Sequence, residues 1–196
     1  PLLAALGNYG GPTPTMLPLA GSPAIDAAAA TSVTTDQRGL PRVIGPWPDI
    51  GAVEANWPPT NVVVTTSADA GTGSLRDTIA HYPVGSTITF ANNLSGSTIL
   101  LTSGQLLLNK NLTLDASALP GGLQINGNTN SRIFQVTRGA TVLLDSLTIT
   151  NGTAGGDQGG GIYNSGTVTV NRCTLMGNSA GILGGGIFNN RGTLTL

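Results

Sequence analysis

The stretch that decides the fold is Gly159-Gly-Gly-Ile-Tyr-Asn164, because it returns 25 residues later as Gly184-Gly-Gly-Ile-Phe-Asn189. Each copy runs into alternating threonine and aliphatic residues, first Thr167-Val-Thr-Val170 and then Thr193-Leu-Thr-Leu196. Strict alternation is typical of a half-buried β-strand, and a fixed period of this length indicates a solenoid. The repeat therefore predicts an all-β fold, a right-handed parallel β-helix whose coils stack about 4.8 Å apart.

Earlier coils follow from the same alternation. Residues 141–149 align with residues 167–175 at an offset of 26, and further strand-like runs begin at residue 87. Their spacing would also suit a β-sandwich, but the internal repeat favours the solenoid, with about four or five coils over 85–196. The alternation predicts that aliphatic residues and the cysteine point inward and that threonines point outward. The inward set is Leu147, Ile149, Val168, Val170, Cys173, Leu175, Leu194 and Leu196; the outward set is Thr148, Thr167, Thr169, Thr174, Thr193 and Thr195.

The composition excludes several classes of function. Charged residues make up 9% of the chain, against about 25% in an average domain, and the net charge is −1. Without a basic patch we expect no nucleic-acid partner, and no apolar run is long enough to predict a membrane span. Cys173 is the single cysteine, so the sequence predicts neither a disulfide nor a thiolate metal site.

The chain divides into regions of different character. Residues 1–56 are rich in proline, lack the 25-residue repeat and suggest turns joining short strands. A proline-rich linker follows at 57–61, and then a capping strand and helix at 62–84, with the helix near 74–81 and Ser74 as its N-cap. Such a helix would cover the apolar end of the first coil. The coils of 85–196 stop inside a strand-like run, so we expect the chain to be a segment of a longer solenoid.

These motifs resemble a known family. The glycine-rich coils, and the run Ala70-Gly-Thr-Gly-Ser-Leu-Arg-Asp-Thr-Ile79, resemble right-handed parallel β-helix repeat proteins of bacterial surfaces. The first region is similar to the choice-of-anchor region that follows the last coil in that family. It carries this likeness in four blocks: Asn8-Tyr-Gly-Gly-Pro-Thr13, Gly21-Ser-Pro-Ala-Ile-Asp26, Asp36-Gln-Arg-Gly-Leu-Pro-Arg42 and Asp49-Ile-Gly-Ala-Val-Glu54. The resemblance implies the end of one β-helix module joined to the beginning of another.

The acidic residues do not form a recognisable catalytic set. Glycoside hydrolysis needs two facing carboxylates, and lyase chemistry needs a base beside arginine, lysine or a metal. The offset of 26 stacks Asp145 on Asn171, and Asp115 has no identifiable acidic neighbour. We therefore predict no catalytic, metal or cofactor site and no enzymatic activity.

The polar residues that remain receive structural roles. Asp36 with Arg38, or Asp49 with Arg42, are expected to form ion pairs and backbone bonds that hold the loop-rich first region together. Asn164 and Asn189 occupy equivalent turns, so their side chains are predicted to form a hydrogen-bonded ladder between coils.

The function predicted from these features is structural: an extracellular or cell-surface module of a fibre, stalk or filament. Its expected partners are copies of itself, joined head to tail by chain continuation or across a subunit interface, and cell-surface glycans. The predicted contact joins Leu194 and Leu196 to Pro1, Leu2 and Leu3. Two alternatives remain: a carbohydrate-active or carbohydrate-binding β-helix whose site lies outside this segment, and an adhesin.

Overall fold

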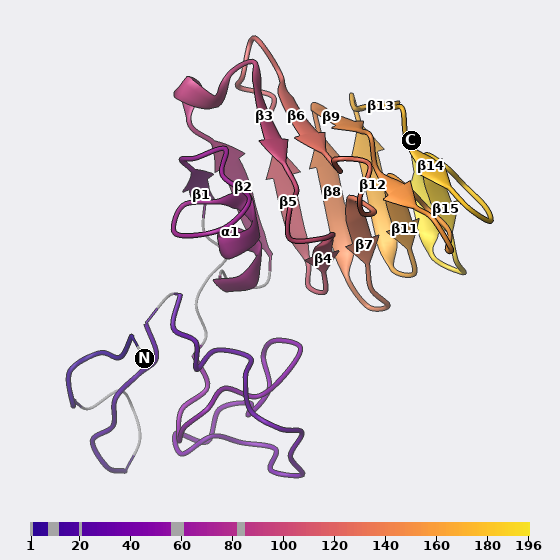
Figure 1. Ribbon diagram of the computed structural model, residues 1–196. Helices are drawn as coiled ribbons and strands as arrows, with labels where there is room; N and C mark the ends of the chain where they lie inside the picture. Colours follow the sequence, from indigo (N-terminus) through magenta and orange to yellow (C-terminus); the bar gives the residue numbers. More distant parts are fainter. Residues whose placement is uncertain (1, 8–11, 20, 56–60, 82–84) are drawn as a thin grey trace. The chain divides into compact units, whose positions relative to one another are not determined.

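The computed structural model describes residues 2–7, 12–19, 21–55, 61–81 and 85–196, without the side chain of His81. The chain forms two compact units, one within residues 1–60 and one that comprises residues 61–80 and 85–196. The second unit is a parallel β-solenoid, in which strands of successive turns lie side by side (Figure 1). This confirms the predicted fold class, with one short α-helix among the described residues.

Each complete turn of the solenoid contributes one strand to each of three parallel sheets, and the long sheet has two additional strands. The long sheet contains β1 (Asn61–Val64), β2 (Ser86–Phe90), β5 (Leu112–Asp115), β8 (Thr141–Asp145), β12 (Thr167–Asn171) and β16 (Thr193–Thr195). The second sheet contains β3 (Ser97–Leu100), β6 (Leu123–Asn126), β9 (Leu147–Thr150) and β13 (Thr174–Met176). The third sheet contains β4 (Leu106–Leu108), β7 (Phe134–Val136), β11 (Ile162–Asn164) and β15 (Ile187–Asn189). In the last turns β10 (Thr153–Ala154) and β14 (Ser179–Ala180) add a two-stranded sheet.

The strand register follows the repeat where the repeat is visible. Thr141 pairs with Thr167 and Thr167 pairs with Thr193, each 26 residues apart, while Ile162 pairs with Ile187 at an offset of 25. The turn from β5 to β8 is longer, because Asp115 pairs with Asp145 at an offset of 30. The additional residues of the longer turns lie in the corners, so the strands stay aligned while the length of the coil varies.

The predicted inward and outward faces are confirmed with one exception. Leu147, Ile149, Val168 and Val170 are buried, Cys173, Leu175 and Leu194 pack against the same core, and the outward threonines are half-buried or exposed. Leu196 was predicted to point inward, but its side chain is 83% exposed. It lies beyond β16, and no strand among the described residues covers it, so Leu196 is not part of the buried core.

A short helix lies at the β1 end of the solenoid. Helix α1 (Leu75–His81) begins after Ser74, whose Oγ accepts a hydrogen bond from the backbone N–H of Asp77 at 3.2 Å. This is the predicted N-cap geometry, which satisfies a free N–H of the first turn. Leu75 and Ile79 are buried in one apolar cluster with Val64 and Ile88.

The described residues of the first unit form no regular sheet. They form turns and isolated bridges, Leu3 with Pro18, Gly7 with Thr15 and Thr35 with Pro41. The short strands expected here are therefore wrong, since hydrogen bonds to side chains replace a backbone ladder. The expected linker falls on residues 57–60, outside the described part, and β1 begins at Asn61, the last residue of that expected linker.

Candidate functional site

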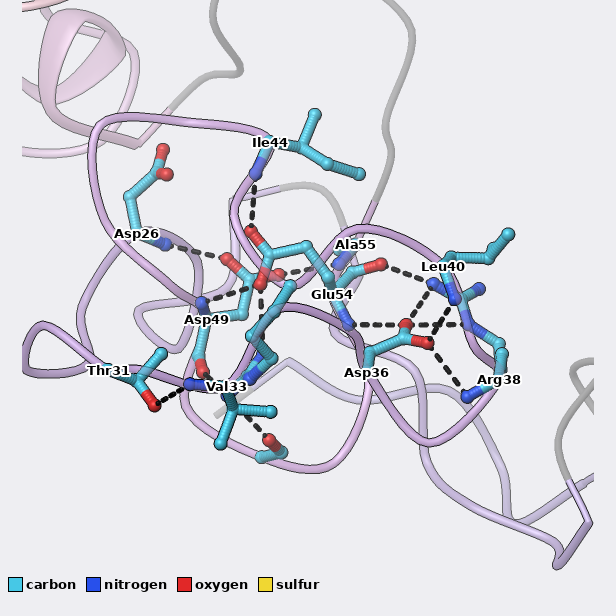
Figure 2. A network of polar contacts seen from close by, with 12 residues as sticks. Asp26, Thr31, Val33, Asp36, Arg38, Leu40, Ile44, Asp49, Glu54 and Ala55 are labelled. Carbon is cyan, nitrogen blue, oxygen red and sulfur yellow. Dashed lines mark hydrogen bonds and ion pairs between the residues drawn. The ribbon is translucent and has the colours of Figure 1, made fainter.

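Three buried carboxylates organise the second half of the first unit. Asp36, Asp49 and Glu54 are all buried, and their oxygens accept hydrogen bonds from backbone N–H groups of distant loops (Figure 2). Asp36 also pairs with Arg38, at 2.7 Å between the Nη2 and Oδ2 atoms. We call Asp36, Arg38, Arg42, Asp49 and Glu54 the charged network.

Arg42 has a different acidic partner from the one predicted. Its Nη1 lies 2.9 Å from Oε2 of Glu54, while its Nη2 donates to the backbone carbonyl of Asp49. The carboxylate of Asp49 instead accepts the backbone N–H groups of Asp26 and Ala55, at 2.8 and 2.6 Å. The expected Asp49–Arg42 ion pair is therefore wrong, because the loop from 43 to 53 places Glu54 beside the guanidinium.

The charged network keeps the carboxyl group of Asp36 ionised. Burial raises the pKa of Asp36, but hydrogen bonds from the Arg38 side chain and the backbone N–H groups of Glu54, Arg38 and Leu40 outweigh it. The net effect lowers the pKa of Asp36. Because a buried charge is tolerated only when such partners surround it, this arrangement is suited to holding loops together.

In the solenoid, arginines join residues that lie roughly one turn apart. Arg76 on α1 pairs with Asp69 and donates to the backbone carbonyls of Gly104 and Gln105. Arg132 then donates to Oε1 of Gln105 and to Oδ2 of Asp157, at 3.0 and 2.6 Å. The guanidinium of Arg132 also lies 4.8 Å from the ring centroid of Tyr163. This chain of contacts links α1 to successive coils.

Asp145 forms a second contact between coils. It accepts hydrogen bonds from Arg172, Asn171 and Ser146, and the Arg172 contacts are 3.0 and 2.8 Å long. The bond from Arg172 is the main reason that the pKa of Asp145 is lowered to about 2. Ser146 and Arg172 are equivalent corner residues, and both have the left-handed backbone that a one-residue bend requires.

Asp115 does have an acidic neighbour, contrary to the prediction. It pairs in register with Asp145, and Oδ1 of Asp115 accepts the backbone N–H of Ser117. The fixed offset of 26 missed this pair, because four additional residues lie in the turn between the two strands. Two carboxylates therefore do occupy adjacent coils.

The asparagine ladder joins the third and long sheets. Nδ2 of Asn164 donates to Oδ1 of Asn189 at 2.7 Å and to the carbonyl of Thr193 at 2.9 Å. Asn164 is fully buried, whereas Asn189 is exposed. Asn178, which the sequence analysis missed, has a similar role, because it bonds the backbone of Ile149 and Gly152 in the preceding coil.

The residues expected to mediate self-association have different environments. Leu2 and Leu196 are exposed, Leu3 is half-buried, and Leu194 packs against the core. Pro1 lies outside the described residues. Pro1, Leu2 and Leu3 belong to the first unit, and Leu194 and Leu196 belong to the solenoid.

The described residues contain no group of three or more His, Cys, Asp or Glu side chains arranged to hold a metal ion. The described helices are too short to cross a membrane. Cys173 is half-buried, and burial raises the pKa of its thiol.

Comparison with family models, curated proteins and solved structures found no match for this chain.

Proposed function

We propose that this chain is a structural module of an extracellular or cell-surface fibre, stalk or filament. The observation that carries the proposal is how the solenoid uses its polar side chains. Arg76, Arg132 and Arg172 all bond groups in a neighbouring turn, at sequence separations of 25 to 29 residues. Because these arginine side chains already bond a neighbouring turn, the arrangement favours a load-bearing rod over a surface that binds or converts a substrate. The location outside the cell rests on the resemblance of the coils to bacterial surface proteins.

The edge of the last described turn supports extension by further coils. β16 continues the register of β12, and Leu175, Ile187 and Leu194 are only partly buried beside it. Parallel strands with free backbone groups and exposed leucines are templates for further pairing. We propose that the next coil comes either from following chain or from the first region of a second copy, around Leu2 and Leu3. Head-to-tail contacts of this heterologous kind do not close on themselves, so they propagate.

Sedimentation of the purified chain over a range of concentrations tests association between copies. We expect the average mass to rise with concentration for the original chain and for Ile182→Glu, which adds a charge on an exposed loop of the same coil. Leu196→Glu should suppress the rise, because it places the charge on the proposed contact. Equal masses for all three proteins at every concentration would contradict the proposal.

A carbohydrate-active enzyme is the second candidate, and the pairing of Asp115 with Asp145 is the observation that favours it. Against this role, Asp145 is held by three side chains and has a pKa of about 2, so it has no proton to donate near neutral pH. We expect no turnover of polyuronates or neutral glycans. Turnover that Asp145→Asn and Asp115→Asn abolish, in folded protein, would establish the enzyme instead.

A further inference from the structure

A shallow polar groove lies over the outer face of the second sheet. Its volume is about 280 Å³, near the lower limit of small-ligand sites. The floor consists of side chains that point outward from neighbouring strands. The full lining is Gly96, Ser97, Thr98, Gly121, Gly122, Leu123, Gln124 and Thr148.

The groove lies where the corner between the long sheet and the second sheet is widest. In the first turns, residues 91–96 and 116–122 separate the long sheet from the second sheet. In later turns the same corner shrinks to Ser146 alone, or to Arg172 and Cys173. The wide corners are also bonded to each other, since Gly96 N donates to the Gly122 carbonyl and Gly121 N donates to Ser95 Oγ, both at 2.8 Å. They form a fixed wall beside the outward row of Thr98, Gln124 and Thr148.

The lining has hydrogen-bonding groups that the fold does not use. Thr98 donates to Oε1 of Gln124 at 2.9 Å, which fixes the orientation of that amide. The Nε2 of Gln124 and the hydroxyls of Ser97 and Thr148 have no hydrogen-bond partner among the residues that the structure describes. No side-chain atom lies within 4 Å of the position that a Cβ would take at Gly96 or Gly122, so a ligand can approach the backbone there.

The chemistry of the lining selects the ligand. None of the lining residues is charged. An anionic ligand would lack the arginine or lysine that its recognition ordinarily uses. Hydroxyl groups both donate and accept, as do the serine, threonine and glutamine groups that face them. An extended peptide would instead pair its backbone with a sheet edge, whereas this groove presents side chains from a sheet face.

The outer face of the third sheet is a weaker candidate for the same role. It carries Tyr163 and Phe188, whose ring centroids lie 5.6 Å apart. However, Arg132 covers Tyr163, and the Tyr163 hydroxyl already accepts a hydrogen bond from Asn190 at 2.6 Å. The Tyr163 hydroxyl therefore already has a partner in the protein, whereas Gln124 Nε2 and the hydroxyls of Ser97 and Thr148 in the groove have none among the described residues.

We propose that this groove binds a neutral saccharide chain, with Gln124 and Thr148 as its principal side-chain contacts. The site lies inside the described solenoid and does not depend on association between copies. Each of these side chains should contribute a hydrogen bond or two, so removing one should weaken binding roughly three- to tenfold.

Nuclear magnetic resonance titration of the labelled chain tests the proposal, with cellohexaose, xylohexaose and mannohexaose as neutral probes and hexagalacturonate as the charged probe. We expect at least one neutral probe to shift the backbone amide signals of Gly96, Gly121 and Gly122 in a saturable way. Gln124→Ala and Thr148→Val should raise the dissociation constant of that probe by the factor given above. Thr174→Val is the matched control, because Thr174 lies next to Thr148 in the same outward row but outside the groove. The probe should bind the Thr174→Val variant with the same dissociation constant as the original chain.

Three results would overturn the proposal: no saturable shift of these glycine signals with any neutral probe, an equal response to hexagalacturonate, or equal effects of Thr148→Val and Thr174→Val. The unperturbed part of the spectrum reports whether each variant is folded. Sedimentation is measured separately, so a failed titration leaves the structural role standing.

Discussion

The first unit and the solenoid are stabilised by different kinds of contact. Among the described residues of the first unit, the buried hydrophobic side chains are Ala24 and Val53, while three acidic residues, Asp36, Asp49 and Glu54, are also buried. The solenoid reverses this balance: leucine, isoleucine, valine and phenylalanine side chains fill its interior in one continuous cluster. Its ion pairs lie outside that cluster, and two of them, Arg132 with Asp157 and Arg172 with Asp145, join successive turns.

The difference shows what each architecture needs. Stacked strands satisfy their backbone groups by pairing with the next turn, so the interior can be apolar throughout. The backbone N–H and C=O groups of loops have no neighbouring strand to pair with. In the first unit, carboxylate and arginine side chains form hydrogen bonds with them instead. A mutation should therefore be most damaging in the solenoid when it adds a charge, and in the first unit when it removes one.

The largest effect is expected from Val170→Asp. Val170 is buried in the solenoid, so the new carboxylate would have no partner, and the free energy of unfolding should fall by about 4 kcal/mol or more. Thr169→Asp is the neighbouring control on the outer face and should change it by less than about 1 kcal/mol. Denaturant unfolding measures both, and similar losses would mean that the assigned faces are wrong.

In the first unit, the most destabilising substitution is expected to be Glu54→Gln, which removes a buried charge. It leaves Arg42 without its acidic partner and should cost about 3 kcal/mol, since breaking a buried pair leaves an uncompensated charge. Hydrogen exchange should accelerate at Ile44 and Asp49, whose N–H groups bond Glu54, and should stay unchanged in the solenoid. Asp157→Asn is the control, because the side chain of Asp157 is 62% exposed and its ion pair should contribute much less to stability than the buried pair of Glu54 and Arg42.

A smaller loss is expected from the asparagine ladder. Asn164→Ala removes bonds to Asn189, Thr193 and Gly166 from a fully buried position, which should cost about 2 kcal/mol. Asn189→Ala removes an exposed side chain and should cost less. If thermal unfolding ranks the two variants in the opposite order, the ladder is not a structural device.

The smallest effect is expected in the pH dependence of stability at acidic pH. The pKa of Asp145 is about 2 in the folded chain, below its ordinary value of 3.8, so its ion pair stabilises the fold fully above about pH 4. That stability should be lost as the pH falls from about 4 to about 2. Because Arg172 is largely exposed, solvent screening should limit the loss to the order of 1 kcal/mol. Asp145→Asn should flatten this part of the pH profile, and an unchanged profile would contradict the assignment.

The sequence predicted the parts of the molecule that repeat. The offsets of 25 and 26, the inward residues Leu147 and Val168 and the N-cap at Ser74 all follow from local patterns, and the structure confirms them. These features depend on neighbours along the chain or one turn away.

The contacts that were missed depend on loops. A fixed period could not locate the partner of Asp115, since the turn that follows it is longer than its neighbours. A usable signal was present: Leu112-Thr-Leu-Asp115 and Val142-Leu-Leu-Asp145 are similar strand endings that align regardless of spacing. For Arg42 no comparable signal existed, because the path of the loop decides whether Asp49 or Glu54 reaches its guanidinium.

Electron microscopy of the purified chain at increasing concentration tests most directly whether the solenoid is a structural module that extends by adding copies. The account predicts filaments with one copy per axial repeat, in which the β16 end of one copy meets the first region of the next. Discrete single particles at every concentration, with the β16 edge covered by the chain's own residues, would contradict it.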